Sequence, residues 1–333
     1  MPVVTGEVEL PSGHFAYLEQ GHPEAPLILL AHGFPDHPKT FLPLMALLST
    51  AGYRCVAPWL RGYAPSTLSG PFDRQRVGDD LADIAEALSP NAPAVLIGHD
   101  WGAGAAYTAV GRWPQRFRAA VTLAVPHVAA FERNLRGSRS QQQRSAYMAL
   151  FMLPALPEKV LAFADFAYVE RLWRRWSPGY TARPEYMREL KNTLRASMPG
   201  PLGYYRALRP SRMRLRQALL DARVRIYVPL LHLQASRTKP IIVDGKHFLP
   251  TKDYIGRTPK MFSNVQAIYA GVLGEPNMIP AEVAAGKVVV LSVPKDAMGK
   301  PRWSGTRQPA SGQYPRAHSS RPVARSQRHR VGH

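Results

Sequence analysis

Short apolar runs alternate with longer amphipathic segments along the first 126 residues. Apolar runs bounded by Gly or Pro are typical of buried strands in a parallel sheet, whereas apolar residues at every third or fourth position predict helices. The pattern predicts strands at 14–21, 26–36, 54–59, 92–98 and 117–126, and helices at 40–53, 76–89 and 102–113. This alternation predicts an α/β fold with a doubly wound, mostly parallel sheet.

The pattern changes after residue 126. The next stretch, to about residue 222, is rich in Arg, Tyr, Trp and Met and has helical periodicity with no clear strand, and an apolar run at 224–234 then predicts a strand again. An all-helical insertion between two strands of one sheet indicates a cap. We therefore expect a core of residues 1–126 and 222–234 with a helical cap of residues 127–221.

The end of the chain carries much of the positive charge. The formal net charge is +20, and residues 299–333 hold eight Lys or Arg and no acid, which leaves +12 for the rest. This Arg-, Ser- and Pro-rich segment has few aliphatic residues and no period, so it is expected to be a disordered basic tail. Charge alone gives weak attraction to polyanions, and no specific nucleic-acid partner is predicted.

The remaining composition is that of an ordinary globular chain. The single cysteine, Cys55, excludes a disulfide within the chain and is expected in the core. The first residues lack the basic and apolar regions of a signal peptide, and no apolar run reaches the roughly 20 residues of a membrane span. We therefore expect a cytoplasmic protein with no membrane partner.

One stretch, VLIGHDWGAGAAY at 95–107, places a carboxylate between two glycines where a predicted strand becomes a predicted helix. A residue on such a sharp turn is raised at the carboxyl edge of the sheet, and its neighbours at Gly98 and Gly102 must be small because the backbones approach closely. This is the nucleophile-elbow pattern, with Asp100 in place of the more usual Ser. The alternative is an Asp that caps an ordinary helix.

A second motif, HGFPD at 32–36, forms the end of the stretch 26–36 that is predicted as a strand. In an elbow architecture, the residue after His-Gly and the residue after the nucleophile supply backbone N–H groups to an oxyanion hole. Those residues are Phe34 and Trp101. The supporting motif residues are His32, Gly33 and Pro35, together with the two elbow glycines.

Residues 1 to about 234 resemble the α/β-hydrolase fold and, within it, the epoxide hydrolases, through HGFPD, APWLRGYAPS and GHDWGAG. Two cap segments, RSAYMALFMLPALPE and GPLGYYRAL, are similar to those that carry the family's epoxide-activating tyrosines, and Tyr147 and Tyr205 fall on these positions. The resemblance implies a small apolar epoxide as substrate, attack by Asp100, and two phenols that donate to the epoxide oxygen. It implies no metal and no cofactor.

A haloalkane dehalogenase is the alternative enzyme, because it shares the fold and the Asp nucleophile. A halide must be held by side-chain N–H donors, and Trp101 could supply one. The second donor is often an Asn at the position of Phe34, and Phe has no donor. Two cap tyrosines also suit an oxygen leaving group better, so we favour the epoxide.

Attack by Asp100 would form an ester on its carboxylate. That ester must be hydrolysed by a water that a histidine activates, with an acid that orients the histidine. Neither the acid nor the histidine is found at the expected spacing. The loop after the strand at 224–234 reads ASRTKP, without a carboxylate, and His247 follows only 13 residues after Gln234, although a strand-helix-strand unit needs roughly 30 residues. His247 is therefore a weak candidate for the base.

The last part of the chain departs from the epoxide hydrolase pattern. Residues 235–298 form an atypical C-terminal segment, in which 253–294 faintly resembles a protease-associated domain through VQAIYAGVLG and AAGKVVVLSVP. A third interpretation is thus a degenerate or chimeric protein that keeps the pocket without turnover. The pattern does not determine the oligomeric state.

Overall fold

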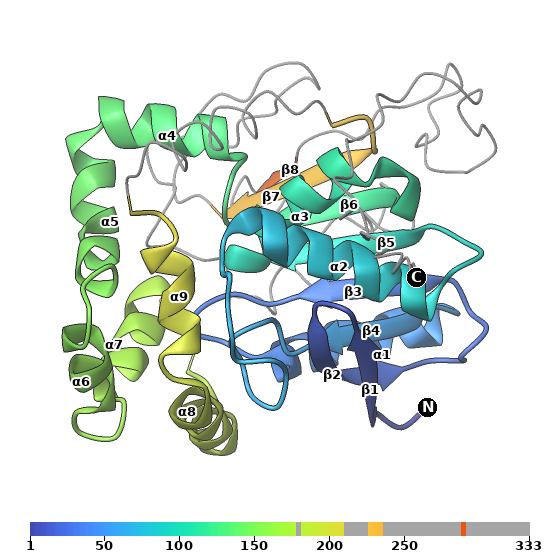
Figure 1. The fold of residues 1–333 in the computed structure, drawn as a ribbon, viewed down its shortest axis with the longest axis horizontal. Helices are drawn as coiled ribbons and strands as arrows, with labels where there is room; N and C mark the ends of the chain where they lie inside the picture. The colour runs from blue at the N-terminus through green and yellow to red at the C-terminus, as the bar shows by residue number, and fades with distance from the viewer. Residues whose placement is uncertain (178–180, 210–225, 236–287, 291–333) are drawn as a thin grey trace, which may run out of the picture.

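The computed structural model describes residues 1–177, 181–209, 226–235 and 288–290. They form an eight-stranded sheet in the order β1-β2-β4-β3-β5-β6-β7-β8 (Figure 1). The strands are β1 (Val4–Leu10), β2 (Gly13–Gln20), β3 (Leu27–Ala31), β4 (Arg54–Pro58), β5 (Ala94–His99), β6 (Phe117–Leu123), β7 (Leu230–Ala235) and β8 (Val288–Val290). The five central strands, from β4 to β7, pair in parallel, and the outer pairs are antiparallel. The predicted mostly parallel α/β fold is confirmed.

Helices cover both faces of the sheet. Along β3, Leu27 and Leu29 belong to one apolar cluster and Ile28 and Leu30 to the other, because successive side chains of a strand point to opposite faces. The first cluster includes α2 (Arg74–Leu88) and α3 (Trp101–Arg112), and the second includes α1 (Leu42–Thr50). Burial on both faces explains why β3 reads as an unbroken apolar run.

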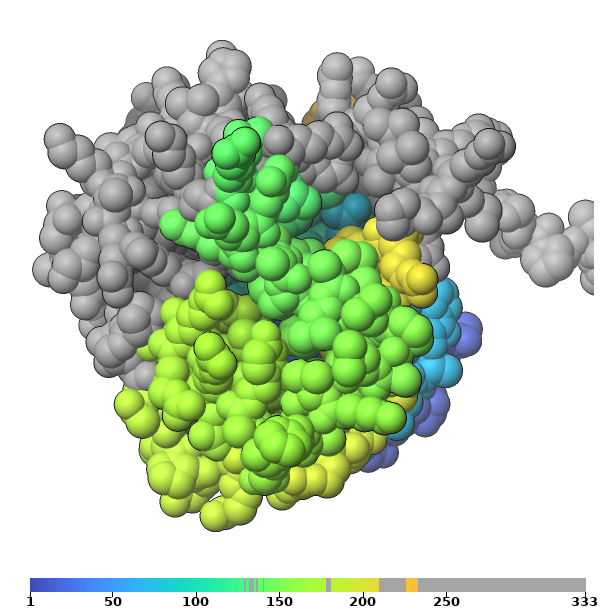
Figure 2. All heavy atoms as spheres, turned by 90° about the vertical axis from the view of Figure 1, so that its left-hand side faces the viewer, coloured from blue at the N-terminus to red at the C-terminus, as the bar shows by residue number. Residues whose placement is uncertain are grey.

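Between β6 and β7, all regular structure in the described residues is helical. The helices are α4 (Val128–Gly137), α5 (Arg139–Phe151), α6 (Leu156–Ala162), α7 (Ala167–Trp176), α8 (Pro184–Ser197) and α9 (Gly200–Arg206). They lie to one side of the sheet in Figure 1, and they face the viewer in green to yellow in Figure 2. We refer to α4–α9 as the helical insertion.

Two strand boundaries differ from the expectation by five residues or more. The strand expected at 26–36 ends at Ala31, because Gly33 and Pro35 do not continue a ladder. The strand expected at 224–234 begins only at Leu230, directly after Pro229, which has no N–H to donate.

The pattern also missed β1, an edge strand in which Val8 and Leu10 are only half-buried and Glu7 and Glu9 are exposed. β8 comes from the segment at 284–294 that the sequence pattern assigns to a separate module, but it pairs antiparallel with β7 in the main sheet. The rest of 253–294 and the tail at 299–333 lie outside the described residues. Within the described part of the chain, no helix combines the length and apolarity that a membrane crossing requires.

Candidate active site

Asp100 lies on the sharp turn between β5 and α3. Its backbone angles are φ 53° and ψ −116°, an arrangement that a non-glycine residue adopts at a cost of about 1–3 kcal/mol. A Cβ on Gly98 would lie 2.4 Å from the Gly102 carbonyl oxygen, and a Cβ on Gly102 would lie 2.1 Å from the Ala31 oxygen. Both positions therefore require glycine, and the turn has the geometry of an elbow rather than that of a capped helix, because no side-chain cap is made.

The Asp100 carboxylate meets the loop that follows β3. The Phe34 N–H donates to Asp100 Oδ1 at 2.9 Å, and the Trp101 N–H also hydrogen-bonds to this carboxylate. A Cβ on Gly33 would come within 2.3 Å of the Asp100 Cβ, so the close approach requires glycine there as well. Burial raises the pKa of Asp100 to about 6, while the two backbone N–H groups pull it down. Asp100 is therefore mostly ionised at pH 7 and above.

His32 fixes the conformation of this loop through hydrogen bonds. Its ring is fully buried, and burial lowers its pKa to about 3, so the imidazole is neutral. The Leu60 N–H donates to Nε2 at 3.2 Å, so Nδ1 carries the proton and donates to the Gly33 carbonyl at 3.0 Å. His32 thus joins the end of β3 to the segment after β4 and has a structural role.

Tyr147 of α5 and Tyr205 of α9 line the same cavity as Asp100. The two phenol rings lie 6.0 Å apart between centroids, and their hydroxyls interact. Burial, with the nearby Asp100 charge, raises the pKa of both tyrosines well above the ordinary value, so both are neutral hydrogen-bond donors. The Trp101 side chain also hydrogen-bonds to Tyr205.

The cavity has a volume of about 90 Å³. Most of its wall is apolar, formed by Val125, Pro126, Val128, Phe131, Met148 and Leu208 among others. A cavity of this kind suits a small apolar molecule. Within the described ranges, no three His, Cys, Asp or Glu side chains gather as metal ligands would.

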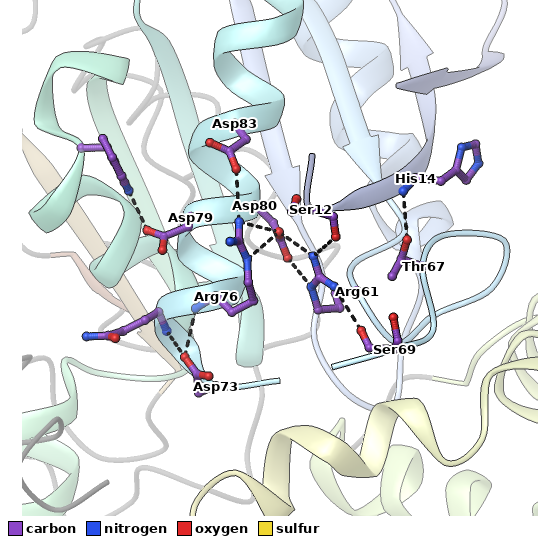
Figure 3. A network of polar contacts seen from close by, with 12 residues as sticks. Ser12, His14, Arg61, Thr67, Ser69, Asp73, Arg76, Asp79, Asp80 and Asp83 are labelled. Carbon is purple, nitrogen blue, oxygen red and sulfur yellow. Dashed lines mark hydrogen bonds and ion pairs between the residues drawn. The ribbon is translucent and has the colours of Figure 1, made fainter. Parts of the chain in front are cut away.

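A buried ion pair between Arg61 and Asp80 fixes the segment after β4, which α9 contacts (Figure 3). Arg61 donates to both oxygens of Asp80, from Nε at 2.7 Å and from Nη2 at 2.8 Å, and it also binds the Ser12 and Ser69 carbonyls. The Tyr204 hydroxyl, next to Tyr205, donates to the Arg61 carbonyl at 2.6 Å. The sequence motif APWLRGYAPS includes Arg61 but gives it no role, since its partners lie in distant segments.

The structure thus brings Asp100, Tyr147, Tyr205 and the N–H groups of Phe34 and Trp101 together. His247 and the ASRTKP segment from residue 236 onward lie outside the described residues, so the proposed base remains an expectation.

Comparison with known proteins agrees with this fold. Residues 26–153 match the family model described as alpha/beta hydrolase fold. An epoxide hydrolase of Caballeronia sordidicola is 35% identical over 193 residues, which cover 55% of this chain and 56% of that protein. Epoxide hydrolase 3 of Xenopus tropicalis is 34% identical over 161 residues, covering 47% of this chain and 43% of that protein.

Solved structures show the same relationship. An epoxide hydrolase of Vigna radiata superposes with a TM-score of 0.55 at 25% identity. The superposed region covers 68% of this chain and 77% of that protein. Epoxide hydrolase A of Mycobacterium thermoresistibile gives a TM-score of 0.57 at 23% identity, with 69% and 82% covered.

The chain has the α/β-hydrolase fold. Within that fold it is epoxide hydrolase-like, as the sequence motifs indicated. It spans about half the length of the curated relatives it matches.

Proposed function

We propose that this protein opens small apolar epoxides through an ester on Asp100. The main support is one arrangement: a buried carboxylate and two neutral phenols line the same cavity. The names of the curated relatives support the same substrate class. In this proposal the helical insertion is the cap that carries the two phenols.

In the first step, Asp100 attacks one carbon of the epoxide ring. Oδ1 accepts the Phe34 N–H, so Oδ2 is the oxygen that forms the new C–O bond. The ring C–O bond breaks, its electron pair goes to the epoxide oxygen, and that oxygen takes a proton from Tyr147 or Tyr205. Because an alkoxide is strongly basic, positioned acids are needed at this point.

In the second step, water attacks the carbonyl carbon of the ester. Negative charge then develops on Oδ1, where the N–H groups of Phe34 and Trp101 stabilise it. The bond between the carbonyl carbon and Oδ2 then breaks, and the diol leaves with Oδ2. One proton of the water ends on that diol oxygen, and the other restores the tyrosine hydroxyl. A base must take the proton from the water, and general-base help is typically worth about 10²–10⁴-fold in rate. Since ASRTKP offers no acid and His247 is a weak candidate, we expect the ester to form faster than it is released.

The haloalkane dehalogenase alternative has less support at this site. The Trp101 indole is engaged with the Tyr205 hydroxyl, and the Phe34 ring packs against Phe151 and Tyr205 at centroid distances of 5.4 Å. A halide would therefore find one indole already engaged and no second N–H from the Phe34 side chain. The two phenols favour an oxygen leaving group.

The test is a time course of styrene oxide consumption and of diol formation at several protein concentrations. We expect a burst of epoxide consumption proportional to protein concentration, with the ester trapped on the protein, followed by slow diol release, and no burst in Asp100→Asn. Bromide release from a bromoalkane without reaction of the epoxide would instead identify a dehalogenase. Reaction with neither substrate would overturn the proposal in favour of a non-enzymatic protein.

A further inference from the structure

The loop that carries the Phe34 N–H is tied to the helical insertion by side chains from two helices. From α7, the Trp173 indole Nε1 donates to the Pro35 carbonyl at 2.8 Å. From α8, the Tyr186 hydroxyl donates to Asp36 Oδ1 in a short hydrogen bond. These contacts fall on the two residues that directly follow Phe34.

The two side chains form one unit. Their rings pack with centroids 5.4 Å apart, and the Tyr186 ring also packs on His37 at 4.8 Å. Asp36 is 5% exposed, and it also accepts the His37 N–H at 2.8 Å and the Thr40 hydroxyl. The contact is therefore partly buried and aimed at specific atoms.

A further ion pair joins the same two regions near the surface. Lys39 Nζ lies 3.0 Å from Glu189 Oε1 of α8, and both side chains are partly exposed. Such a pair is worth at most about 1 kcal/mol. The partly buried hydrogen bonds of Trp173 and Tyr186 thus dominate the attachment.

The position of the loop matters because the Phe34 N–H reaches Asp100 Oδ1 at 2.9 Å. The Pro35 carbonyl held by Trp173 lies one residue away, so a displacement there moves the Phe34 amide. Hydrogen bonds weaken steeply with distance and angle. A displaced amide would no longer favour the ionised form of Asp100 or stabilise the oxyanion.

We infer that Trp173 and Tyr186 are positioning residues, through which the helical insertion sets the Phe34 N–H on Asp100. This inference rests on the proposed function for its catalytic meaning, but the geometry it describes can be measured without catalysis. The helical insertion then contributes both phenols from one side and fixes an oxyanion donor from the other.

The test uses Trp173→Phe and Tyr186→Phe, which keep an aromatic ring and remove only the donor. The matched control is Trp113→Phe, which removes another indole N–H bond to the core, the one from Nε1 to Asp79 Oδ1 at 2.6 Å. Selective ¹³C labelling of aspartate carboxyls reports the pKa of Asp100, with the resonance assigned by Asp100→Asn.

In the unmodified protein, we expect the Asp100 carboxyl resonance to titrate with its midpoint at the pKa of about 6. In both loop variants it rises by roughly 1 pH unit, because a displaced N–H no longer stabilises the carboxylate. It stays unchanged in Trp113→Phe, even if that variant loses stability. Reaction with styrene oxide should also show slower ester release in both loop variants.

The groups whose pKa values respond to the charge of Asp100 are Asp36 and the phenols of Tyr63, Tyr147 and Tyr205. The charged or titratable side chains of Arg74, Arg112 and His127 also line the cavity. The phenols stay neutral over this pH range. Burial raises the pKa of Asp36 to about 7, and Asp36 gives its own resonance. Tyr186→Phe should raise the Asp36 midpoint further, whereas Trp173→Phe should leave it nearly unchanged.

Unchanged Asp100 midpoints in both loop variants would overturn the inference, and Trp173 and Tyr186 would then be packing residues only. Failure of the unmodified protein to react with any epoxide is a separate result. It would overturn the proposed function and leave the measured link between α7, α8 and Asp100 in place.

Discussion

At the scale of single residues, Asp100 combines two costs, a strained backbone and a buried carboxylate. The backbone takes a positive φ at a non-glycine residue, and burial raises the pKa from 3.8 to about 6. A raised pKa in the folded state means that the ionised carboxylate destabilises the fold. The positions of Gly98 and Gly102 allow the strain, and the Phe34 and Trp101 N–H groups offset part of the burial.

Asp100→Asn should therefore be more stable than the unmodified protein at neutral pH. Below pH 3.8, both the folded and unfolded forms of Asp100 are protonated, so the two proteins should differ little. The difference grows as the pH rises from about 4 to 6, and it reaches about 3 kcal/mol above pH 7. Urea unfolding at pH 4, 6 and 8 measures it. Equal stabilities at pH 8 would contradict the raised pKa.

Tyr147 and Tyr205 should each contribute to the opening of the ring. Tyr147→Phe or Tyr205→Phe should slow ester formation by roughly 10²-fold, since general-acid help is lost while the second phenol remains. The double variant should form no detectable ester. Tyr168→Phe is the control, because its ring also packs on Phe151, at 6.2 Å, but it does not line the cavity. Rapid-quench measurements with styrene oxide give the rates, and equal rates in all variants would remove the phenols from the mechanism.

At the scale of elements, the elbow depends on how closely α3 approaches β3. Gly102 lies against the Ala31 carbonyl, whereas Gly104, half a turn further along α3, has only the Arg74 side chain near it, 3.8 Å from the position that an alanine methyl would take. The two positions therefore differ in how well they can accommodate a side chain, although both glycines belong to the same short motif.

Gly102→Ala should destabilise the protein by about 2 kcal/mol or more, because its methyl would push α3 away from the sheet. Gly104→Ala should be neutral or stabilise by up to about 1 kcal/mol, since alanine favours the helix and meets no close atom. Thermal unfolding of both variants tests the pair. Similar losses in both would show that the approach of α3 to β3 is not the limiting contact.

The elements that the sequence predicted correctly are the ones buried on both faces or strongly amphipathic. β3 and β5 are continuous apolar runs, and α2 has a clear apolar stripe. β1 was missed because an exposed edge strand leaves little apolar pattern, and β7 was placed too early because the run at 224–234 contains Pro229. In these cases tertiary context, not local pattern, determines the boundary.

At the scale of the whole molecule, distant segments meet in ways that no local pattern reveals. The two elbow glycines and HGFPD predicted the neighbourhood of Asp100, because both motifs follow parallel strands that end at one edge. The bond between Trp173 and Pro35 joins residues 138 positions apart, and that between Tyr186 and Asp36 joins residues 150 apart. Only the folded chain shows these contacts.

The Arg61–Asp80 pair likewise joins three separate segments, the turn after β1, the segment after β4 and α2. Asp80→Asn should lower the free energy of unfolding by about 3–5 kcal/mol, because it leaves a buried guanidinium without its charged partner. Asp83→Asn is the matched control, since its side chain is 40% exposed and contacts the same network through Arg76. That change should cost at most about 1 kcal/mol. Equal effects in urea unfolding would mean that the buried pair has no special weight.

The central claim is that Asp100 is a nucleophile, and peptide mass spectrometry after brief incubation with styrene oxide tests it most directly. We expect a mass increase of one styrene oxide on the peptide that contains Asp100, in up to one copy per chain, and none in Asp100→Ala. Hydroxylamine, which cleaves esters, should remove the added mass. A protein that turns over or binds the epoxide while the Asp100 peptide stays unmodified at every time point, or an adduct that persists in Asp100→Ala, would contradict the account.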